Sequence, residues 1–423
     1  NAAGRSERWA LAVSLLQEAS RHPGCSDVVT YGAAISACAK GRQSGLASAL
    51  LDGMRAEHIE ANVRTFSAAI SACEMNEWDL ALGLLRKLQQ NALQPDDIAF
   101  CAVISCCEKS QQWQQGLLLL EEMQLSRVDP SMVTLSAAIS ACDKGLQWEL
   151  GLHILSEMHS ADLRPDALAY CAAMRACGQS GQWQRTLDLL ARMRREGPVP
   201  DVVVNNVAIA ACQKGEQWIG ALALLEGMRL WGPSPDAISY GSAISACEKG
   251  PMPELGFIVF IEMLQSSLEP SVINFNAAIS ACEKSGLWEE ALALVDEMWL
   301  KGLTPNSITY SAVISACETD QQWGLSLELL LEMRQAGFEP SLIACNAAIS
   351  SCEKSDQWKW ALDVMDALQF YKLEVSVITY SSIISACSRG HQSSFAQQLL
   401  VQMSRARLQP NLITYNAAIS ACA

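Results

Sequence analysis

The fold of this chain follows from one stretch, Ile413-Thr414-Tyr415-Asn416-Ala417-Ala418-Ile419-Ser420-Ala421-Cys422. Close copies of it return along almost all of the 423 residues, and the final cysteine marks each copy. These cysteines are 35 residues apart except for one step of 34, and they are Cys38, Cys73, Cys107, Cys142, Cys177, Cys212, Cys247, Cys282, Cys317, Cys352, Cys387 and Cys422. So regular a period predicts a solenoid, in which each unit contacts only its neighbours.

A single unit, residues 272–306, predicts a helical hairpin. Phe275, Ile279 and Cys282 are spaced three or four residues apart, which is typical of the buried face of an amphipathic helix. Gly286 follows this first helix, and a second helical period begins at Trp288. A closing Gly-Leu-Thr-Pro-Asn at 302–306 ends the second helix, so we expect an all-α solenoid of about twelve helix-turn-helix repeats.

The period also predicts how the chain is divided. We expect a partial repeat over 1–27, consisting of a second helix and its closing loop, then eleven tandem repeats over 28–411 and the first helix of a truncated repeat over 412–423. Solenoids need polar capping repeats, and neither end reads as one. The chain begins at Asn1 without an initiator methionine, so we expect a fragment of a longer protein.

Composition excludes several classes of protein. Half of the residues are hydrophobic, yet no run of 18 apolar residues occurs, so no membrane span is predicted. Equivalent helices in a stack lie about 8–10 Å apart, whereas a disulfide needs Cα atoms within roughly 7 Å. We therefore expect the repeated cysteines to be small buried thiols. The five histidines show no zinc-ligand spacing with cysteine pairs, so no metal site or cofactor is predicted.

Most repeated positions indicate packing. The eighth position is isoleucine in eleven of twelve first helices, with Met174 in the other. Tryptophan begins most second helices and methionine ends most of them, and we interpret both sets as packing residues.

The fifth position of each unit varies within this fixed frame. Its residues are small or polar: Gly32, Ser67, Cys101, Ser136, Cys171, Asn206, Gly241, Asn276, Ser311, Asn346, Ser381 and Asn416. Hydrogen-bonding side chains that alternate at one place suggest a recognition code. The alternative is that close helix approach requires a small residue there, which Gly32 and Gly241 favour.

A 35-residue hairpin that opens with Val-Ile-Thr-Tyr-Asn and closes with Gly-Leu-x-Pro-Asp resembles the pentatricopeptide repeat family along essentially the whole chain. The resemblance implies a right-handed superhelix that binds single-stranded RNA, one base per repeat. In that family the fifth and last residues of a repeat choose the base, and an aliphatic second residue wedges between adjacent bases.

Carried over to this chain, the resemblance implies seven pairs of a fifth and a last residue that would choose a base, which we call reading pairs. They are Ser67 with Asp96, Ser136 with Asp166, Asn206 with Asp236, Asn276 with Asn306, Ser311 with Ser341, Asn346 with Ser376, and Ser381 with Asn411. The family's pairing rules favour guanine for the first two pairs, uracil for the third, pyrimidines for the fourth and sixth, and adenine for the last. Asp, Asn and Ser are also the best helix N-caps, so capping alone would explain the last residues.

The implied wedge residues are aliphatic. They are Val29, Ile98, Val133, Val203, Ile238, Ile273, Ile308, Ile343 and Ile378, and Arg64 departs from the pattern.

Charge is the main objection to an RNA partner, because the net charge is −15 and lysine and arginine contacts to phosphate dominate nucleic-acid affinity. Lysines nevertheless recur at the end of the first helix: Lys40, Lys109, Lys144, Lys214, Lys249, Lys284 and Lys354. Acids recur near the end of the second: Glu122, Glu157, Glu226, Glu262, Glu297 and Glu332. The resemblance implies phosphate contacts for the lysines, and a favourable cation at a helix C-terminus is the other explanation.

Two other functions fit part of the sequence, namely peptide binding and deamination. A peptide-binding scaffold of the tetratricopeptide kind fits helical hairpins, but the 35-residue period and the closing Pro-Asp oppose it. His58-Ile59-Glu60 matches the start of a zinc deaminase motif, but no Pro-Cys-x-x-Cys follows. We therefore expect a non-catalytic adaptor in organellar RNA processing, stabilisation or editing, with processing or editing proteins as further partners. Family resemblance implies a chloroplast or mitochondrion.

Overall fold

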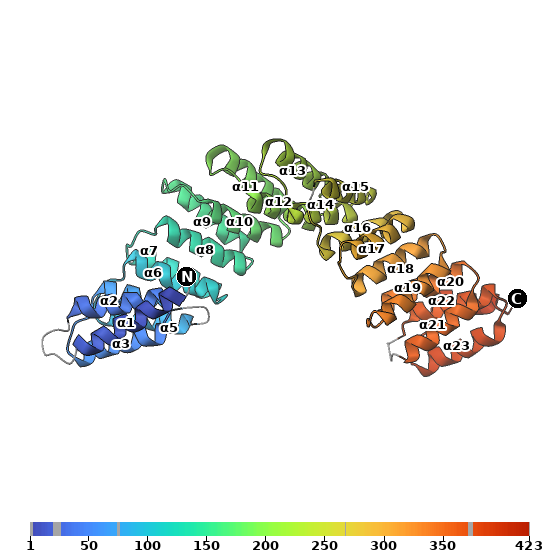
Figure 1. The fold of residues 1–423 in the computed structure, drawn as a ribbon, viewed down its shortest axis with the longest axis horizontal. Helices are drawn as coiled ribbons and strands as arrows, with labels where there is room; N and C mark the ends of the chain where they lie inside the picture. Colours follow the sequence, from blue (N-terminus) through green and yellow to red (C-terminus); the bar gives the residue numbers. More distant parts are fainter. Residues whose placement is uncertain (1–2, 20–26, 74–76, 267, 371–374, 423) are drawn as a thin grey trace. The chain divides into compact units, whose positions relative to one another are not determined.

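The computed structural model describes residues 3–19, 27–73, 77–266, 268–370 and 375–422. These residues form 24 α-helices and no β-strand (Figure 1). The expected all-α helical-repeat solenoid is confirmed, and its right-handed sense stays a prediction. The closing loop expected before residue 27 lies largely outside the described residues.

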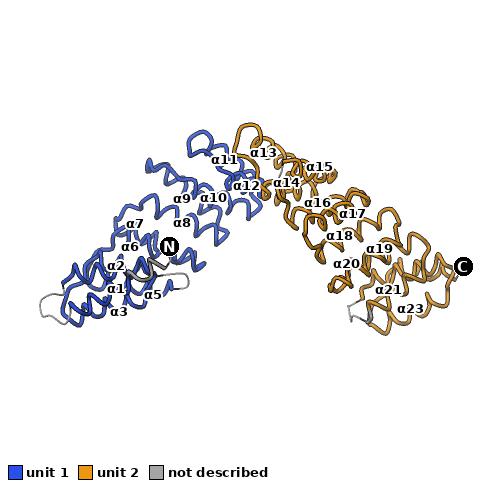
Figure 2. Tube along the Cα trace, in the orientation of Figure 1, with its two compact units in different colours: residues 1–211 blue, residues 212–423 orange. Residues whose placement is uncertain are grey.

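The chain divides into two compact units, Asn1–Ala211 and Cys212–Ala423 (Figure 2). The helices up to the boundary are α1 (Ala3–Ala19), α2 (Val28–Lys40), α3 (Ser44–Ala56), α4 (Val63–Ser71), α5 (Trp78–Gln90), α6 (Asp97–Lys109), α7 (Trp113–Leu125), α8 (Met132–Lys144), α9 (Trp148–Ser160), α10 (Ala167–Gln179), α11 (Trp183–Glu196) and α12 (Val202–Lys214), the last of which contains the boundary. Unit 2 continues with α13 (Trp218–Trp231), α14 (Ala237–Lys249), α15 (Glu254–Gln265), α16 (Val272–Ser285), α17 (Trp288–Leu300), α18 (Ser307–Thr319), α19 (Trp323–Gln335), α20 (Leu342–Lys354), α21 (Trp358–Phe370), α22 (Val377–Arg389), α23 (Ser393–Arg405) and α24 (Leu412–Ser420).

The even-numbered helices are the first helices of the repeats and form a continuous layer within each unit. In unit 1, α6 packs against α8, and α8 packs against α10. In unit 2, each of α14, α16, α18, α20 and α22 packs against the next even-numbered helix. Most second helices contact their own first helix and that of the following repeat, as α7 contacts α6 and α8. The first-helix layer is therefore what joins repeat to repeat.

The eighth position confirms the packing interpretation. Ten of its isoleucines and Met174 are at most 1 % exposed, and Ile419 on α24 is 67 % exposed. The buried residues repeat at spacings of three and four within each first helix, as Phe275, Ala278, Ile279 and Cys282 do in α16. A face this uniform positions every first helix in the same way against the next.

The turns between helices use the left-handed backbone conformation. Gly286 follows α16 with φ +72°, as the Ser-Gly sequence predicts. Most repeats make the same turn with another residue, for example Gln111, Leu146 and Gln321, each with φ between +55° and +59°. This conformation costs a non-glycine residue about 1–2 kcal/mol, so the tertiary packing of the two helices holds the turn closed.

The tryptophan that begins a second helix lies against the end of the next first helix. A Cβ atom placed on Gly145 would be 2.5 Å from the Trp113 ring, and one on Gly250 would be 2.8 Å from the Trp218 ring. Glycine at these two places permits the close approach of the indole. The tryptophans are therefore packing residues, as expected.

The repeated cysteines are free thiols in the described chain, and most are buried. Burial raises the pKa of the Cys142 and Cys282 thiols to about 12 and that of the Cys247 thiol to about 11. Their neutral form is thus strongly preferred in the folded state. None of the described helices combines the length and the apolar character that crossing a membrane would require.

The tryptophan contact can be tested with two glycine substitutions in unit 1. Gly145→Ala should lower the free energy of unfolding by about 1–3 kcal/mol, because the methyl group would overlap the Trp113 ring. Gly83→Ala is the control, since nothing lies within 4 Å of its Cβ position in α5. It should stabilise the helix by about 0.5–1 kcal/mol. Equal effects in urea unfolding would contradict the contact.

The buried thiols predict a loss of stability at alkaline pH. Their folded pKa values lie above the ordinary value of 9.0, so their stabilisation is complete below pH 9 and is lost as the pH rises towards 12. Each such thiol contributes up to about 1.4 kcal/mol per pH unit in that window. Urea unfolding at pH 8 and pH 10.5 should show a smaller loss for Cys142→Ala than for the wild type. An identical loss would show that Cys142 does not titrate on unfolding.

Candidate nucleic-acid interface

The second residue of every first helix except α4, which has Arg64 there, is an exposed aliphatic side chain. The nine wedge residues named from the sequence are between 57 % and 77 % exposed, with Val203 lowest and Ile273 highest. Leu168 and Ile413, at the same position, are 72 % and 66 % exposed. Because these aliphatic residues recur at one place in successive first helices, they form a candidate contact surface.

Four of the seven reading pairs are in direct contact. Ser67 donates a hydrogen bond to Asp96 Oδ1 over 2.9 Å, and Ser136 donates to Asp166 Oδ1 over 3.3 Å. In unit 2, Asn276 Nδ2 donates to Asn306 Oδ1 over 3.4 Å. The hydroxyls of Ser311 and Ser341 lie 3.0 Å apart. The fifth residue of a repeat and its last residue thus meet beside the exposed second position.

Two further pairs meet through a threonine. Thr379 Oγ1 donates to Asn346 Oδ1 over 2.7 Å and lies 3.1 Å from Ser376 Oγ. Thr414 Oγ1 lies 2.7 Å from both Ser381 Oγ and Asn411 Oδ1. These pairs are connected by hydrogen bonds although their own side chains do not touch.

The remaining pair is divided between the two units. Asn206 lies in unit 1 on α12, and Asp236 lies in unit 2, where it caps α14. Asn206 is half-buried, as most of the fifth-position residues are, whereas Ser67 and Ser381 are only 4 % and 8 % exposed.

The last residues are helix N-caps as well. Asp96 Oδ1 accepts a hydrogen bond from the Ala99 backbone N–H over 2.9 Å, and Asp166 Oδ1 accepts from Ala169 over 2.8 Å. Asn306 Oδ1 accepts from the backbone of Ile308 and of Thr309, each over 3.0 Å. Capping is therefore one role of this position, and it fixes the side chain next to the fifth residue of the preceding first helix.

The lysines at the ends of the first helices form two groups. Lys284 makes an ion pair of 3.0 Å with Glu248, and Lys354 makes one of 2.9 Å with Glu318. The other five lysines make no ion pair within the described chain, and all five are exposed: Lys40, Lys109, Lys144, Lys214 and Lys249. The ends of the first helices thus carry both lysines without an ion pair and lysines neutralised by a glutamate.

Carboxylates occupy the same ends. Asp143 on α8 is buried, and its Oδ2 lies 3.1 Å from Arg175 Nε of α10. Burial raises the pKa of Asp143, although Arg175 and Lys144 oppose that change. Burial also raises the pKa of Glu108 on α6. Within unit 1 these carboxylates lie at the same helix ends as Lys109 and Lys144, and Arg175 pairs with Asp143, so both signs of charge meet there.

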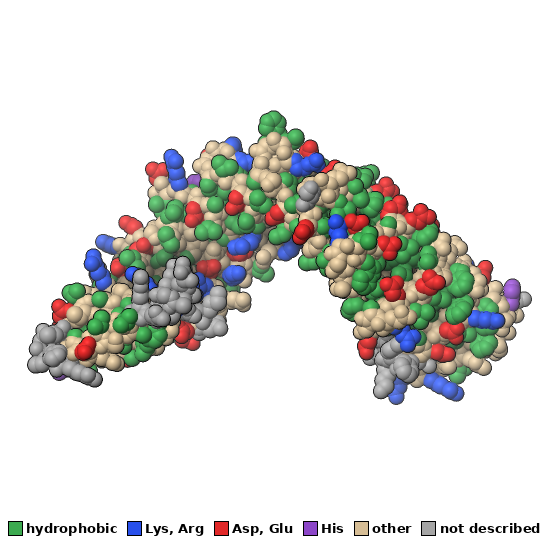
Figure 3. Space-filling view, viewed as in Figure 1, with side chains coloured by type: hydrophobic (Ala, Val, Ile, Leu, Met, Phe, Trp, Pro, Cys, Tyr) green, Lys and Arg blue, Asp and Glu red, His purple; other side chains and the backbone are tan. Residues whose placement is uncertain are grey.

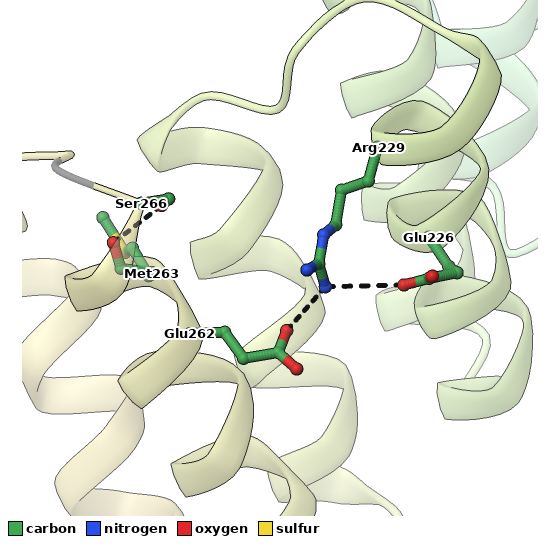
Figure 4. Close-up of polar contacts among 5 residues, drawn as sticks. All are labelled: Glu226, Arg229, Glu262, Met263 and Ser266. Atoms are coloured by element: carbon green, nitrogen blue, oxygen red, sulfur yellow. Dashed lines mark hydrogen bonds and ion pairs between the residues drawn. The ribbon is translucent and has the colours of Figure 1, made fainter.

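The second helices carry much of the acidic charge. Arg229 on α13 lies 2.9 Å from Glu262 of α15 and 3.4 Å from Glu226 (Figure 4). This arginine joins two neighbouring second helices while two carboxylates surround it. Acidic side chains are spread over both units in the face that Figure 3 presents.

No metal site is formed by the residues that the structure describes, which contain no group of three or more His, Cys, Asp or Glu side chains able to hold an ion. His58 lies in the turn after α3 and has a φ of +56°. The histidine of the partial deaminase motif is therefore a turn residue.

Family models match most of the chain. The model described as the pentatricopeptide repeat domain matches residues 14–76, 153–215, 328–389 and 363–423, which together exceed half of the sequence. The chain belongs to the pentatricopeptide repeat family. A PPR repeat family model matches 270–319, and a PPR repeat model matches 98–128 and 308–338.

One solved structure of a maize protein shares the fold. The crystal structure of the pentatricopeptide repeat protein PPR10 from maize has a TM-score of 0.59 and 20 % identity, covering 99 % of this chain. The chain spans 64 % of the length of that protein. The structure of PPR10 in complex with an 18-nt psaJ RNA element has a TM-score of 0.37 and 19 % identity, covering 99 % of this chain and 75 % of that one. No curated protein matched in a sequence search.

The third residue of each first helix is not recognisable from the sequence as part of the candidate site. Thr309, Thr379 and Thr414 are at most 1 % exposed, and a buried small residue on a helix reads as packing. Its only sequence signal is variation among Thr, Ser, Ala, Val and Asn at a buried place.

Proposed function

We propose that this pentatricopeptide repeat protein binds single-stranded RNA along the first turns of its first helices, with one base per repeat. The exposed second-position aliphatics carry the proposal, because they lie one turn from the polar pairs and recur in six of the seven repeats with a reading pair, the other having Arg64. Repeats of this family are read by two or three side chains for each base. A base lying between two successive aliphatic residues would cover both and meet the polar pair with its edge.

The proposed role of the protein is to occupy RNA without catalysis. A bound segment would be shielded from nucleases, kept unfolded, or presented to a processing or editing partner in a chloroplast or mitochondrion. The base preferences named from the sequence for the seven reading pairs remain part of the proposal. The exposed acidic side chains of the second helices are where basic protein partners would be accommodated.

The test is a titration against a randomised single-stranded RNA pool, with sequencing of the bound fraction. Ile273→Ser combined with Ile308→Ser should weaken binding to the whole pool by about thirtyfold, since each loses an apolar contact worth about 1 kcal/mol. Thermal unfolding should change little because both side chains are more than 60 % exposed.

Leu300→Ser is the control for those two substitutions, since Leu300 is 84 % exposed at the end of the second helix α17. It should leave the affinity unchanged. Equal losses in both variants, or no binding by the wild type, would refute the proposed surface. In the second case a peptide-binding scaffold would be the better account.

The two groups of lysines predict different salt effects. Lys249→Gln should reduce the slope of log affinity against log salt concentration by about 0.7–1, as expected for one lost phosphate contact. Lys284→Gln should reduce it less, because Glu248 already neutralises that ammonium group. Lys301 on the second-helix side is paired with Glu297, so Lys301→Gln should have no effect. A slope unaltered by Lys249→Gln would assign that lysine to the helix end alone.

A further inference from the structure

We propose that, where the third residue of a repeat is threonine and the fifth residue of the repeat before it is serine or asparagine, the threonine positions that fifth residue for base reading. This inference rests on the proposed RNA-binding function and adds a specificity-determining position to it. The residue concerned lies in the first turn of the following first helix, where it is buried and directly follows the exposed second residue in the sequence.

The contacts fall into two classes according to this residue. Where it is alanine, at Ala99, Ala169 and Ala344, the preceding fifth residue is serine and bonds directly to the last residue. Where it is threonine, at Thr309, Thr379 and Thr414, the threonine hydroxyl bonds to the preceding fifth residue. In these six repeats the third residue therefore decides whether the fifth residue has a hydroxyl partner in the following first helix.

At Asn276 the network fixes the orientation of the side-chain amide. The Thr309 hydroxyl accepts a hydrogen bond from the Asn306 backbone N–H over 3.1 Å. Its single proton is then directed to Asn276 Oδ1, at 2.6 Å the nearer of its two acceptors. Because Oδ1 of Asn276 is occupied, Nδ2 takes the other side, where one of its hydrogens faces Asn306 Oδ1 over 3.4 Å.

The second Nδ2 hydrogen remains for a ligand. Asn276 is half-buried, so a base at this repeat would meet a hydrogen-bond donor and not the amide oxygen. Donors select bases that present an acceptor on the facing edge. Thr379 holds Asn346 in the same way over 2.7 Å, so the same presentation is expected at that repeat.

Gly241 shows the opposite arrangement. The third residue of the next repeat is Asn274, which is 3 % exposed, and a Cβ atom on Gly241 would be 2.6 Å from its Nδ2. Asn274 Nδ2 donates to the Ala237 carbonyl over 2.8 Å, and its Oδ1 accepts from the backbone and hydroxyl of Ser271. The asparagine fills the space of a fifth-position side chain, and its burial keeps its amide out of reach of a base, so this repeat should accept any base.

The test compares matched threonine substitutions in the RNA-pool titration. Thr309→Val and Thr379→Val should each reduce the base preference at the aligned position by at least about fivefold, which corresponds to one lost hydrogen-bond contact. Overall affinity for the pool should stay within about twofold. Thr309→Ser keeps the hydroxyl and should retain the preference, which separates positioning from mere packing.

Thr134→Val is the control. Thr134 is equally buried, but its hydroxyl donates to Asp97 Oδ1 over 2.6 Å and not to the preceding fifth residue, Cys101. It should lose stability and keep every base preference. Unchanged preferences in both Thr309→Val and Thr379→Val, with a wild type that reads those bases, would overturn the inference. No RNA binding by the wild type would instead overturn the proposed function beneath it.

A variant that acquires a new base preference provides an independent test. Gly241→Asn together with Asn274→Thr reproduces beside Ser271 the residue types of Asn346, Thr379 and Ser376. The double variant should acquire at the repeat of Gly241 the base preference that the wild type shows at the repeat of Asn346. Gly241→Asn alone should be destabilised by overlap with Asn274. A folded double variant without that preference would contradict the inference.

Discussion

The close packing of one first helix on the next constrains the rest of this structure. A face of isoleucine, alanine and cysteine is buried in the first helices that another first helix follows, as Ile279 and Cys282 are in α16. Because that face is fixed, the second position must point into solvent and the fifth must lie at the margin of the contact. The aliphatic row and the polar pairs are thus consequences of one packing rule repeated along the chain, and variation is tolerated only beside it.

The margin of the contact is where stability and recognition share residues. Asp96 caps α6 and accepts a hydrogen bond from Ser67, so one carboxylate both starts a helix and completes a reading pair. The buried hydroxyl of Thr309 is satisfied by Asn306 and Asn276 together. Since a buried polar group without a partner is costly, changing the reading residue changes what its buried neighbour must be. Pairs of residues in adjacent repeats are therefore the unit of specificity in the proposed mechanism.

Much of this architecture could be predicted from the sequence because the repeat is an internal alignment. The helix over 272–284, its end at Gly286 and the burial of Cys282 all follow from spacing and glycine placement. Three features could not be predicted. The ion pair of Lys354 with Glu318 depends on the register of two first helices, Gly145 matters because the Trp113 ring lies on it, and Thr309 looks like a packing residue until its hydroxyl is seen against Asn276.

The central claim is that the first helices form the RNA-binding face, and zero-length ultraviolet crosslinking to uridine-containing single-stranded RNA with peptide mapping tests it most directly. The account predicts crosslinks on first-helix residues such as Cys101 and Lys249. The second helices offer a stringent comparison, because Trp231 on α13 is 90 % exposed and Trp299 on α17 is 47 % exposed. Crosslinks concentrated at these tryptophans, with none on the first helices, would contradict the account.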